Sequence, residues 1–234
     1  MSLRGNVFLA LWNDVTRSRE PEYDRWHTLE HVPERVAVSG FNGARRYVNR
    51  TRETHRYFTL YEVDDVATFD HPEYVDLVKH PTTWTASMRS DFRNAVRASC
   101  TLAVSRGEGI AVALGILCFN AAALDDITRA MDHVLADPGV TACHLGRACD
   151  GGVPMAWMPP SDEHGVRAFD HVFLIEALER ESALQALTHA RILMGLANLA
   201  VDFGNDVYDL AFVFPGHNPD ERRVHRRRDW PPEG

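Results

Sequence analysis

The two halves of the chain show the same order of secondary-structure signals. In each half a β-rich run is followed by an amphipathic helical stretch, two strands, a second helical stretch and a closing strand. The most similar segments are 58–63 (FTLYEV) and 172–177 (VFLIEA), which lie 114 positions apart. The order β-α-β-β-α-β predicts a four-stranded antiparallel sheet with both helices on one face.

Two such units in one chain can cover each other's open sheet faces. We therefore expect an α+β protein made of two tandem ferredoxin-like βαββαβ modules, packed sheet to sheet as a pseudo-dimeric α+β barrel. The predicted boundaries are 1–108 for the first module, which holds the candidate site, and 109–214 for the second. Residues 215–234 form a basic tail rich in Pro and Arg.

Composition excludes several classes of protein. An apolar content of 45% excludes intrinsic disorder. The longest apolar run, 110–119, is about half the roughly twenty residues that a membrane helix needs. A net charge of −8 argues against a nucleic-acid partner. Four Cys without CxxC spacing, and no leader pattern, predict a cytoplasmic protein with reduced thiols.

The halves differ in chemistry. Residues 1–108 hold three of the five Trp and five of the six Tyr, and their charges cancel. Residues 109–234 carry the whole net charge of −8. Tyr and Trp suit the walls of binding sites because they combine apolar area with a polar tip. This favours a site in the first half with the second half as cover, although both halves acting as cover is an equal alternative.

The densest chemistry lies in 22–35 (EYDRWHTLEHVPER). On a helix, His27, Glu30 and His31 share one face. Pro33 lacks an N–H, so we expect the helix to kink or restart there. His31 would then lie near a helix C-terminus, where the dipole raises its pKa. An imidazole near a carboxylate suits acid/base catalysis. The alternative is a solvated surface helix.

The same stretch offers a metal hypothesis. Residues 27–31 read H-x-x-E-H, the spacing with which inverted zinc proteases bind zinc through two His while Glu activates water. That chemistry needs a third ligand, and Pro33 lies where such a helix should continue. A zinc hydrolase is therefore the third hypothesis, and we predict no metal and no cofactor.

Residues 23–48 resemble the dimeric α+β barrel superfamily, in particular its EthD-like bacterial members. The resemblance is carried by these segments: Trp26, Glu30-His31, 33–35 (PER), 40–41 (GF) and 44–47 (ARRY). It covers about residues 5–105, with His27 in place of an aromatic residue and Ser39 in place of Pro. The superfamily includes cofactor-independent monooxygenases, lactone isomerases, polyketide cyclases and haem-handling enzymes. It implies a pocket between sheet and helices or inside the barrel.

Strand alternation orders the remaining candidates. Arg45 and Tyr47 point to one face of their strand and Arg46 to the other. An arginine could clamp an anionic substrate, or it could pair with Glu62 or an acid of the first helix. Tyr61 shares a face with residues 57 and 59. If that face lines a pocket, the three hydroxyls could donate hydrogen bonds to a ligand.

We predict a small-molecule enzyme of bacterial metabolism, of isomerase, cyclase or cofactor-independent monooxygenase type. His31 acts as acid/base, Glu30 orients it, and His27 lies beside them. The predicted substrate-binding residues are Arg45, Arg46, Trp26, Tyr47, Tyr61 and Trp84. The partner is a small-molecule ligand, not a membrane.

The alternative is a non-catalytic binding or assembly module that acts through residues 150–165 or the tail. Met and Trp side chains in 150–165 are typical of a lid or of a contact between subunits. If the segment is a subunit contact, the protein forms a homodimer. An open, partly polar pocket of at least about 300 Å³ at the first helix would favour the enzyme, and a solid barrel the module.

Overall fold

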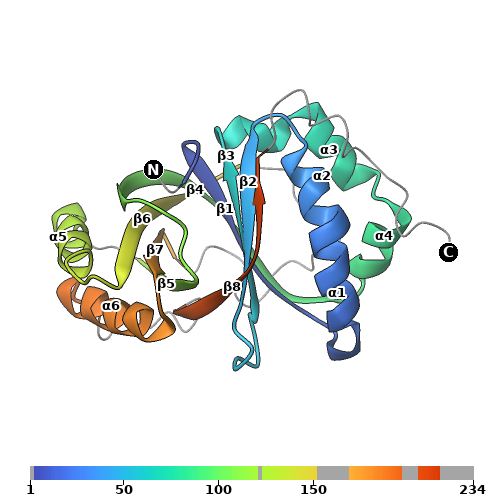
Figure 1. Ribbon diagram of the computed structural model, residues 1–234. Helices are drawn as coiled ribbons and strands as arrows, with labels where there is room; N and C mark the ends of the chain where they lie inside the picture. Colours follow the sequence, from blue (N-terminus) through green and yellow to red (C-terminus); the bar gives the residue numbers. More distant parts are fainter. Residues whose placement is uncertain (1–2, 121–122, 152–168, 197–204, 217–234) are drawn as a thin grey trace.

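A computed structural model describes residues 3–120, 123–151, 169–196 and 205–216. Within these ranges eight antiparallel strands close into one barrel, in the order β1-β3-β2-β8-β5-β7-β6-β4 (Figure 1). The strands are β1 (Val7–Val15), β2 (Phe41–Val48), β3 (Tyr57–Val63), β4 (Phe92–Gly107), β5 (Ala113–Phe119), β6 (Val140–Cys149), β7 (His171–Ala177) and β8 (Asp206–Pro215).

Each half contributes one ferredoxin-like sheet, ordered β4-β1-β3-β2 in the first half and β6-β7-β5-β8 in the second. The two sheets join at two seams, where β2 pairs with β8 and β4 pairs with β6. The prediction of two βαββαβ modules packed as a pseudo-dimeric α+β barrel is confirmed. The segments 150–165 and 215–234 lie almost entirely outside the described residues.

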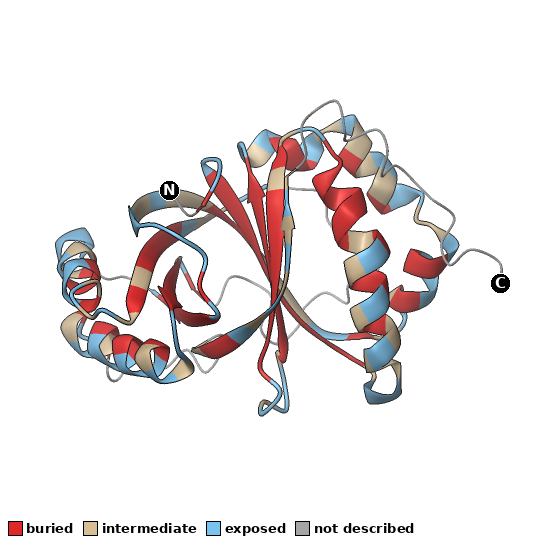
Figure 2. Ribbon diagram, viewed as in Figure 1, coloured by how far each residue is buried: buried red, intermediate tan, exposed pale blue. Residues whose placement is uncertain are grey.

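The helices cover the outside of the barrel on two opposite sides (Figure 1). The first half has α1 (Glu20–Trp26), α2 (Val32–Val36), α3 (Pro72–Lys79) and α4 (Thr83–Arg89), and the second has α5 (Leu124–Val134) and α6 (Arg180–Leu193). Pro72 starts α3 and Pro81 lies in the break before α4. The buried residues of α2, α5 and α6 face the sheet (Figure 2), whereas α4 packs against the first helix through Trp84 and Thr85.

Strand β1 includes two polar residues, Asn13 and Asp14, before it ends at Val15. A bulge between Trp12 and Asp14 interrupts its pairing with β4. The Asp14 carboxylate accepts hydrogen bonds from the backbone N–H groups of His55, at 2.7 Å, and Arg56, at 2.9 Å. A polar residue is therefore tolerated in this strand because its acceptors are satisfied by the neighbouring turn.

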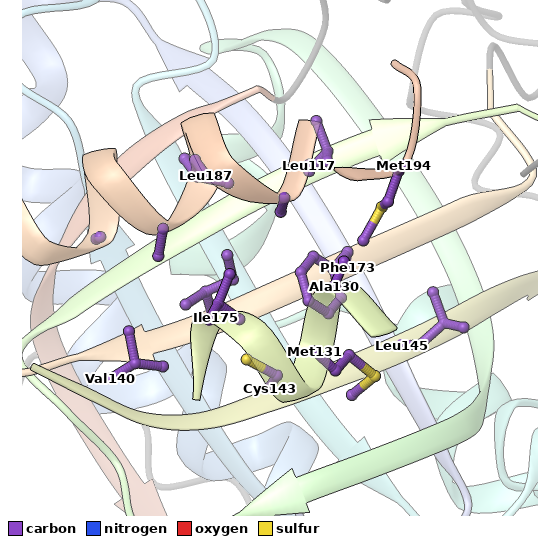
Figure 3. Packing of buried hydrophobic residues seen from close by; sticks show 14 of the residues in the cluster. Leu117, Ala130, Met131, Val140, Cys143, Leu145, Phe173, Ile175, Leu187 and Met194 are labelled. Atoms are coloured by element: carbon purple, nitrogen blue, oxygen red, sulfur yellow. The ribbon is translucent and has the colours of Figure 1, made fainter. Parts of the chain in front are cut away.

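The barrel interior is packed with side chains. Large buried residues from both halves meet there, including Phe8, Trp12, Phe58, Ile116 and Leu174. The helix-covered face of the second half is also apolar (Figure 3), with Leu117, Ala130, Met131, Val140, Cys143, Leu145, Phe173, Ile175, Leu187 and Met194 in contact with one another. Both regions supply stability through burial of apolar area.

An ion cluster inside the barrel links the two halves. Arg45, only 1% exposed, donates to Glu62 of β3 and to Glu176 of β7, each at 2.5 Å. Tyr47 also donates to Glu176, at 3.4 Å. Burial raises the pKa of Glu176, and Arg45 opposes that shift. One cation thus holds two carboxylates that come from matched strands of the two modules.

Replacing Arg45 tests the strength of this link. Arg45→Met leaves Glu62 and Glu176 buried without a cation, so we expect a loss of about 3–5 kcal/mol in the free energy of unfolding. Adding Glu62→Gln and Glu176→Gln should restore most of that loss, since the buried charges are then gone. Urea unfolding of the single and triple variants measures both values. A single variant as stable as the wild type would contradict the link.

Candidate functional site

The first helix is continuous from Glu20 to Val36, through a π-helical turn at His27–His31. The N–H of Val32 donates to the carbonyl of His27, five residues earlier. Pro33 follows directly, and because it has no N–H the α-helical pattern cannot continue through it unchanged. The predicted restart at Pro33 takes the form of a π turn, after which α2 begins at Val32 with Pro33 in its first turn.

The π turn brings the two imidazoles together beneath the helix. The ring centroids of His27 and His31 lie 5.3 Å apart. His27 is 1% exposed, and its Nε2 lies 3.5 Å from the Thr59 hydroxyl of β3. His31 is partly exposed and packs on Trp26, with 4.4 Å between ring centroids. Both rings thus lie in the layer between helix and sheet.

Glu30 faces α4. Its Oε1 accepts hydrogen bonds from the hydroxyls of Thr82, at 2.6 Å, and Thr85, at 2.9 Å. The Thr85 hydroxyl in turn accepts the indole N–H of Trp26, at 3.1 Å. Glu30 therefore reaches His31 through a chain of contacts, from Thr85 to Trp26 and from Trp26 to the imidazole.

The sheet offers a polar row to the helix. Arg97 of β4 is opposite Leu11 of β1, which is opposite Thr59 of β3, and Thr59 is opposite Arg46 of β2. Cross-strand neighbours share a face, so these side chains lie under the helix. Tyr61, two residues after Thr59, lies on the same face.

Several polar atoms in this layer are buried without a hydrogen-bond partner. Within the described part of the chain they include Nδ1 of His27, Nδ1 of His31, the Tyr61 hydroxyl, Nη1 of Arg35, and Nε and Nη2 of Arg97. Such atoms are rare in folded proteins, and each costs about 1–3 kcal/mol when left unpaired. A ligand or ordered water that pairs with them would remove that cost.

The electrostatic surroundings of the imidazoles are cationic. Burial, then Arg46 and Arg35, hold the pKa of His27 well below its usual range. Burial, then Arg35, His27 and Arg89, lower the pKa of His31 in the same way. The prediction of a raised pKa at a helix end is wrong for His31, because burial of the ring, followed by the charge of Arg35, lowers its pKa.

The predicted substrate-binding residues divide between the two faces of the sheet. Trp26, Tyr61 and Arg46 join the histidines in the layer under the helix. Arg46 pairs with Asp24, at 3.5 Å, which is the ion pair with a first-helix acid that we named as the alternative. The indole of Trp84 packs with Trp26, near Tyr23, and donates to Glu22, at 3.2 Å.

Arg45 and Tyr47 lie inside the barrel, on the opposite face from His31. Strand alternation separates Arg45 from Arg46 as predicted, but only the folded barrel shows which of them faces the helix. The imidazoles do not reach the barrel interior, because His27 contacts Thr59 on the helix-covered face of β3.

Arg35 and Arg97 were missed as candidates. Arg35 belongs to the P-E-R segment that carries the family resemblance, so its place in the pattern was the available signal. Arg97 is a single arginine in a strand, and no motif singles it out.

A groove of about 690 Å³ lies between the first helix and strands β2 and β8, lined in part by Arg25, Leu29 and Arg46. It exceeds the pocket size we set for the enzyme hypothesis, but His31 does not line it. A second cavity, of about 330 Å³, is lined in part by Arg45 and Glu62 of the barrel interior. The barrel is therefore not solid, and the pocket criterion does not favour the binding module.

The zinc hypothesis needs a third ligand beside His27 and His31. Among the described residues, no His, Cys, Asp and Glu side chains form a group of three or more that could hold a metal ion. Glu30, the residue that would activate water, is bonded to threonines. In the same ranges, no helix is both long and apolar enough to cross a membrane.

Comparisons with known proteins find similarity in structure only. Neither the protein-family models nor the curated proteins give a match. An anthrone oxidase-like protein aligns with a TM-score of 0.60 at 10% identity, covering 91% of this chain and 94% of its own. A proposed monooxygenase from Fusobacterium nucleatum aligns with a TM-score of 0.53 at 11% identity, covering 91% and 96%.

A proposed monooxygenase from Lactobacillus acidophilus aligns with a TM-score of 0.50 at 11% identity, covering 91% of this chain and 97% of its own. These alignments extend over both halves of the barrel. The chain has the dimeric α+β barrel fold. Since this fold hosts many reactions, the function has to be argued from the site.

The two neutral imidazoles make this dimeric α+β barrel sensitive to acid. The folded state resists protonation of His27 and His31, so below about pH 6.5 the unfolded chain binds more protons. The free energy of unfolding must then fall as the pH decreases, by at most about 1.4 kcal/mol per pH unit for each imidazole.

Urea unfolding between pH 7 and pH 5 measures this slope. The double variant His27→Gln/His31→Gln should lose less stability over that range than the wild type, since other groups titrate alike in both proteins. His189→Gln, on the exposed surface of α6, is the control and should keep the wild-type slope. Equal slopes in the double variant and the wild type would contradict neutral burial of the pair.

Proposed function

We propose that the protein is a small-molecule enzyme that removes a proton from its substrate in the layer between the first helix and the sheet. The unpartnered polar atoms of His27, His31 and Tyr61 carry this proposal. The matching layer of the second half contains apolar side chains, so the fold itself does not require polar groups there. Groups that cost stability in this way are typical of binding sites.

His31 is the proposed proton acceptor. Its lowered pKa keeps the ring neutral at pH 7, and a neutral imidazole is able to accept a proton. Its Nδ1 has no hydrogen-bond partner. His31 is also partly exposed, whereas His27 is sealed against Thr59. We assign His27 to the wall of the site and to holding the second ring in place.

Glu30 is a positioning residue in this proposal. It fixes Thr85, which holds the indole of Trp26, and Trp26 supports the His31 ring. A catalytic base must be held within a fraction of an ångström of its productive position. The buried hydrogen bonds from Glu30 to α4 supply that constraint.

The arginines compensate for the weakness of the base. An imidazole with a lowered pKa is a poor base, but Arg35, Arg46 and Arg89 create a positive field at the same place. That field stabilises the enolate or phenolate that proton loss leaves behind. Proton loss to an enolate is a first step that isomerases, cyclases and cofactor-independent monooxygenases can share.

Of these reactions we propose oxygenation. The anthrone oxidase-like protein and the two proposed monooxygenases share the fold over both halves. We also propose that the chain is an EthD-like bacterial protein of the cytoplasm, that its partner is a small-molecule ligand, and that it forms a homodimer. The module boundaries at 108 and 214 likewise stay a proposal.

A binding or assembly module is the second candidate. The large apolar cluster inside the barrel favours it, since these side chains leave less room for a substrate there. The layer under the first helix argues against it, because a module without a ligand gains nothing from unpaired polar atoms at that position.

Anthrone and molecular oxygen provide the test, since anthrone loses an acidified C–H proton and is oxidised by O₂ to anthraquinone and water. The wild type should speed oxygen uptake above the buffer rate. His31→Ala should lower that enzymatic rate by about 10²–10⁴ through loss of the proton acceptor. An oxygen electrode measures both rates, and circular dichroism checks the fold. Equal uptake by the wild type and the variant would contradict the role of His31.

A further inference from the structure

We infer that the ligand of this site carries a carboxylate next to an aromatic or similarly flat apolar body, and that Arg97 receives the carboxylate. The inference takes its location from the proposed function, but it concerns binding and is tested by binding alone. It names the substrate class that the proton transfer leaves open.

Arg97 presents an unused binding edge. Its Nε and Nη2 are both buried and neither has a hydrogen-bond partner in the described part of the chain. These two nitrogens lie on the side of the guanidinium group whose N–H bonds run parallel. That edge matches the two oxygens of one carboxylate and binds them through paired, charge-assisted hydrogen bonds.

The acidic side chains of the layer have other partners. Glu30 accepts from Thr82 and Thr85, Asp24 pairs with Arg46, and Glu34 lies 3.9 Å from Arg35. Within the described ranges no acidic side chain forms an ion pair with Arg97. A half-buried guanidinium with two buried, unpaired nitrogens and no counter-charge costs stability. An anion that enters the layer would remove part of this cost by pairing with Arg97.

The surroundings of Arg97 define the rest of the ligand. Its guanidinium carbon lies 5.1 Å from the ring centroid of Phe69. Phe69 is 5.8 Å from Tyr74 and 6.0 Å from Phe41, measured between ring centroids. Phe41 in turn contacts Tyr61, at 5.9 Å. A continuous set of aromatic rings therefore extends from Arg97 to the unpartnered Tyr61 hydroxyl.

This arrangement suits an aromatic acid. The rings offer apolar area and edge or face contacts to a flat body, while Arg97 holds the charged end. A phosphate is spherical and hydrated and would use the guanidinium but not the rings. A neutral aromatic amide would use the rings but could not pair with the guanidinium as an anion does.

Benzoate, benzamide and inorganic phosphate are the probes, titrated into the full chain by calorimetry with ligand-observed NMR for weak binding. Benzoate should bind at least about tenfold more tightly than benzamide or phosphate. Arg97→Gln should raise the Kd of benzoate about 10- to 100-fold, as expected for loss of a hydrogen-bonded charge. Arg97→Lys keeps the charge without the paired edge and should give an intermediate Kd.

The matched control is Arg129→Gln, which removes one exposed arginine from α5 and should leave the Kd of benzoate unchanged. Thermal unfolding checks that each variant folds, and if Arg97→Gln does not fold then Arg97→Lys decides. The inference is overturned if benzoate does not bind, if benzamide or phosphate binds as tightly, or if the deciding Arg97 variant binds benzoate like the wild type.

The failures of this inference and of the proposed function are distinguishable. The role of Arg97 is tested by benzoate binding to the wild type and the Arg97 variants, and the role of His31 by oxygen uptake of the wild type and His31→Ala. Benzoate binding that depends on Arg97, together with oxygen uptake unaffected by His31→Ala, would remove the proton-transfer role only. Benzoate binding that does not depend on Arg97, together with oxygen uptake that is lost in His31→Ala, would overturn only the inference that the ligand carries a carboxylate.

Discussion

Closure of the barrel determines where a ligand can bind. The pairing of β2 with β8 and of β4 with β6 leaves the two sheets no open edge, and it turns one face of every strand inward. Aromatic and branched side chains fill that interior, and Arg45 crosses it to reach carboxylates from both halves. Away from that interior, the helix-covered outer faces are where polar side chains can surround a small molecule.

The two outer faces have separate tasks. Beneath α5 and α6 the layer is mostly apolar, with His171 stacked on Phe119 at the start of β7, and it contributes burial (Figure 3). Beneath α1 and α2 the layer includes imidazoles, guanidinium groups and a tyrosine hydroxyl, several of them unpaired. A single ferredoxin-like module with such a layer would be only marginally stable, since small domains bury little surface. Burial of apolar area in the second module offsets the loss of stability that the polar layer causes.

The sequence predicts the strand order well because each signal is local. Three local signals are sufficient to predict a ferredoxin-like module. They are the strands that begin after a glycine, the amphipathic α5, and the similarity of 58–63 to 172–177. The position of the site residues, in contrast, depends on contacts between elements that are far apart in the sequence. Alternation separates Arg45 from Arg46, but only barrel closure places Arg45 among Glu62 and Glu176 and Arg46 under the helix.

The behaviour of the first helix shows the same limit. When the helix is considered alone, Pro33 predicts a break. The break would place His31 at a helix C-terminus, where the dipole favours the protonated imidazole. In the fold, the π turn keeps the helix intact, and Arg35 and Arg89 approach His31. The sign of the pKa shift depends on burial and on charges from other elements, and periodicity in one segment contains neither.

The lowered pKa of His31 has a consequence for the chemistry of the site. A weak base removes a proton only if the product anion is stabilised, and the arginines that weaken the base are the groups that stabilise the anion. Base strength and anion stabilisation are therefore coupled here and cannot be tuned apart. Such a site favours substrates whose acidity rises steeply when the anion is held, such as ketones and phenols conjugated to aromatic rings. It also has little use for a metal ion, because an added cation would weaken the imidazole further while the arginines already provide the positive field.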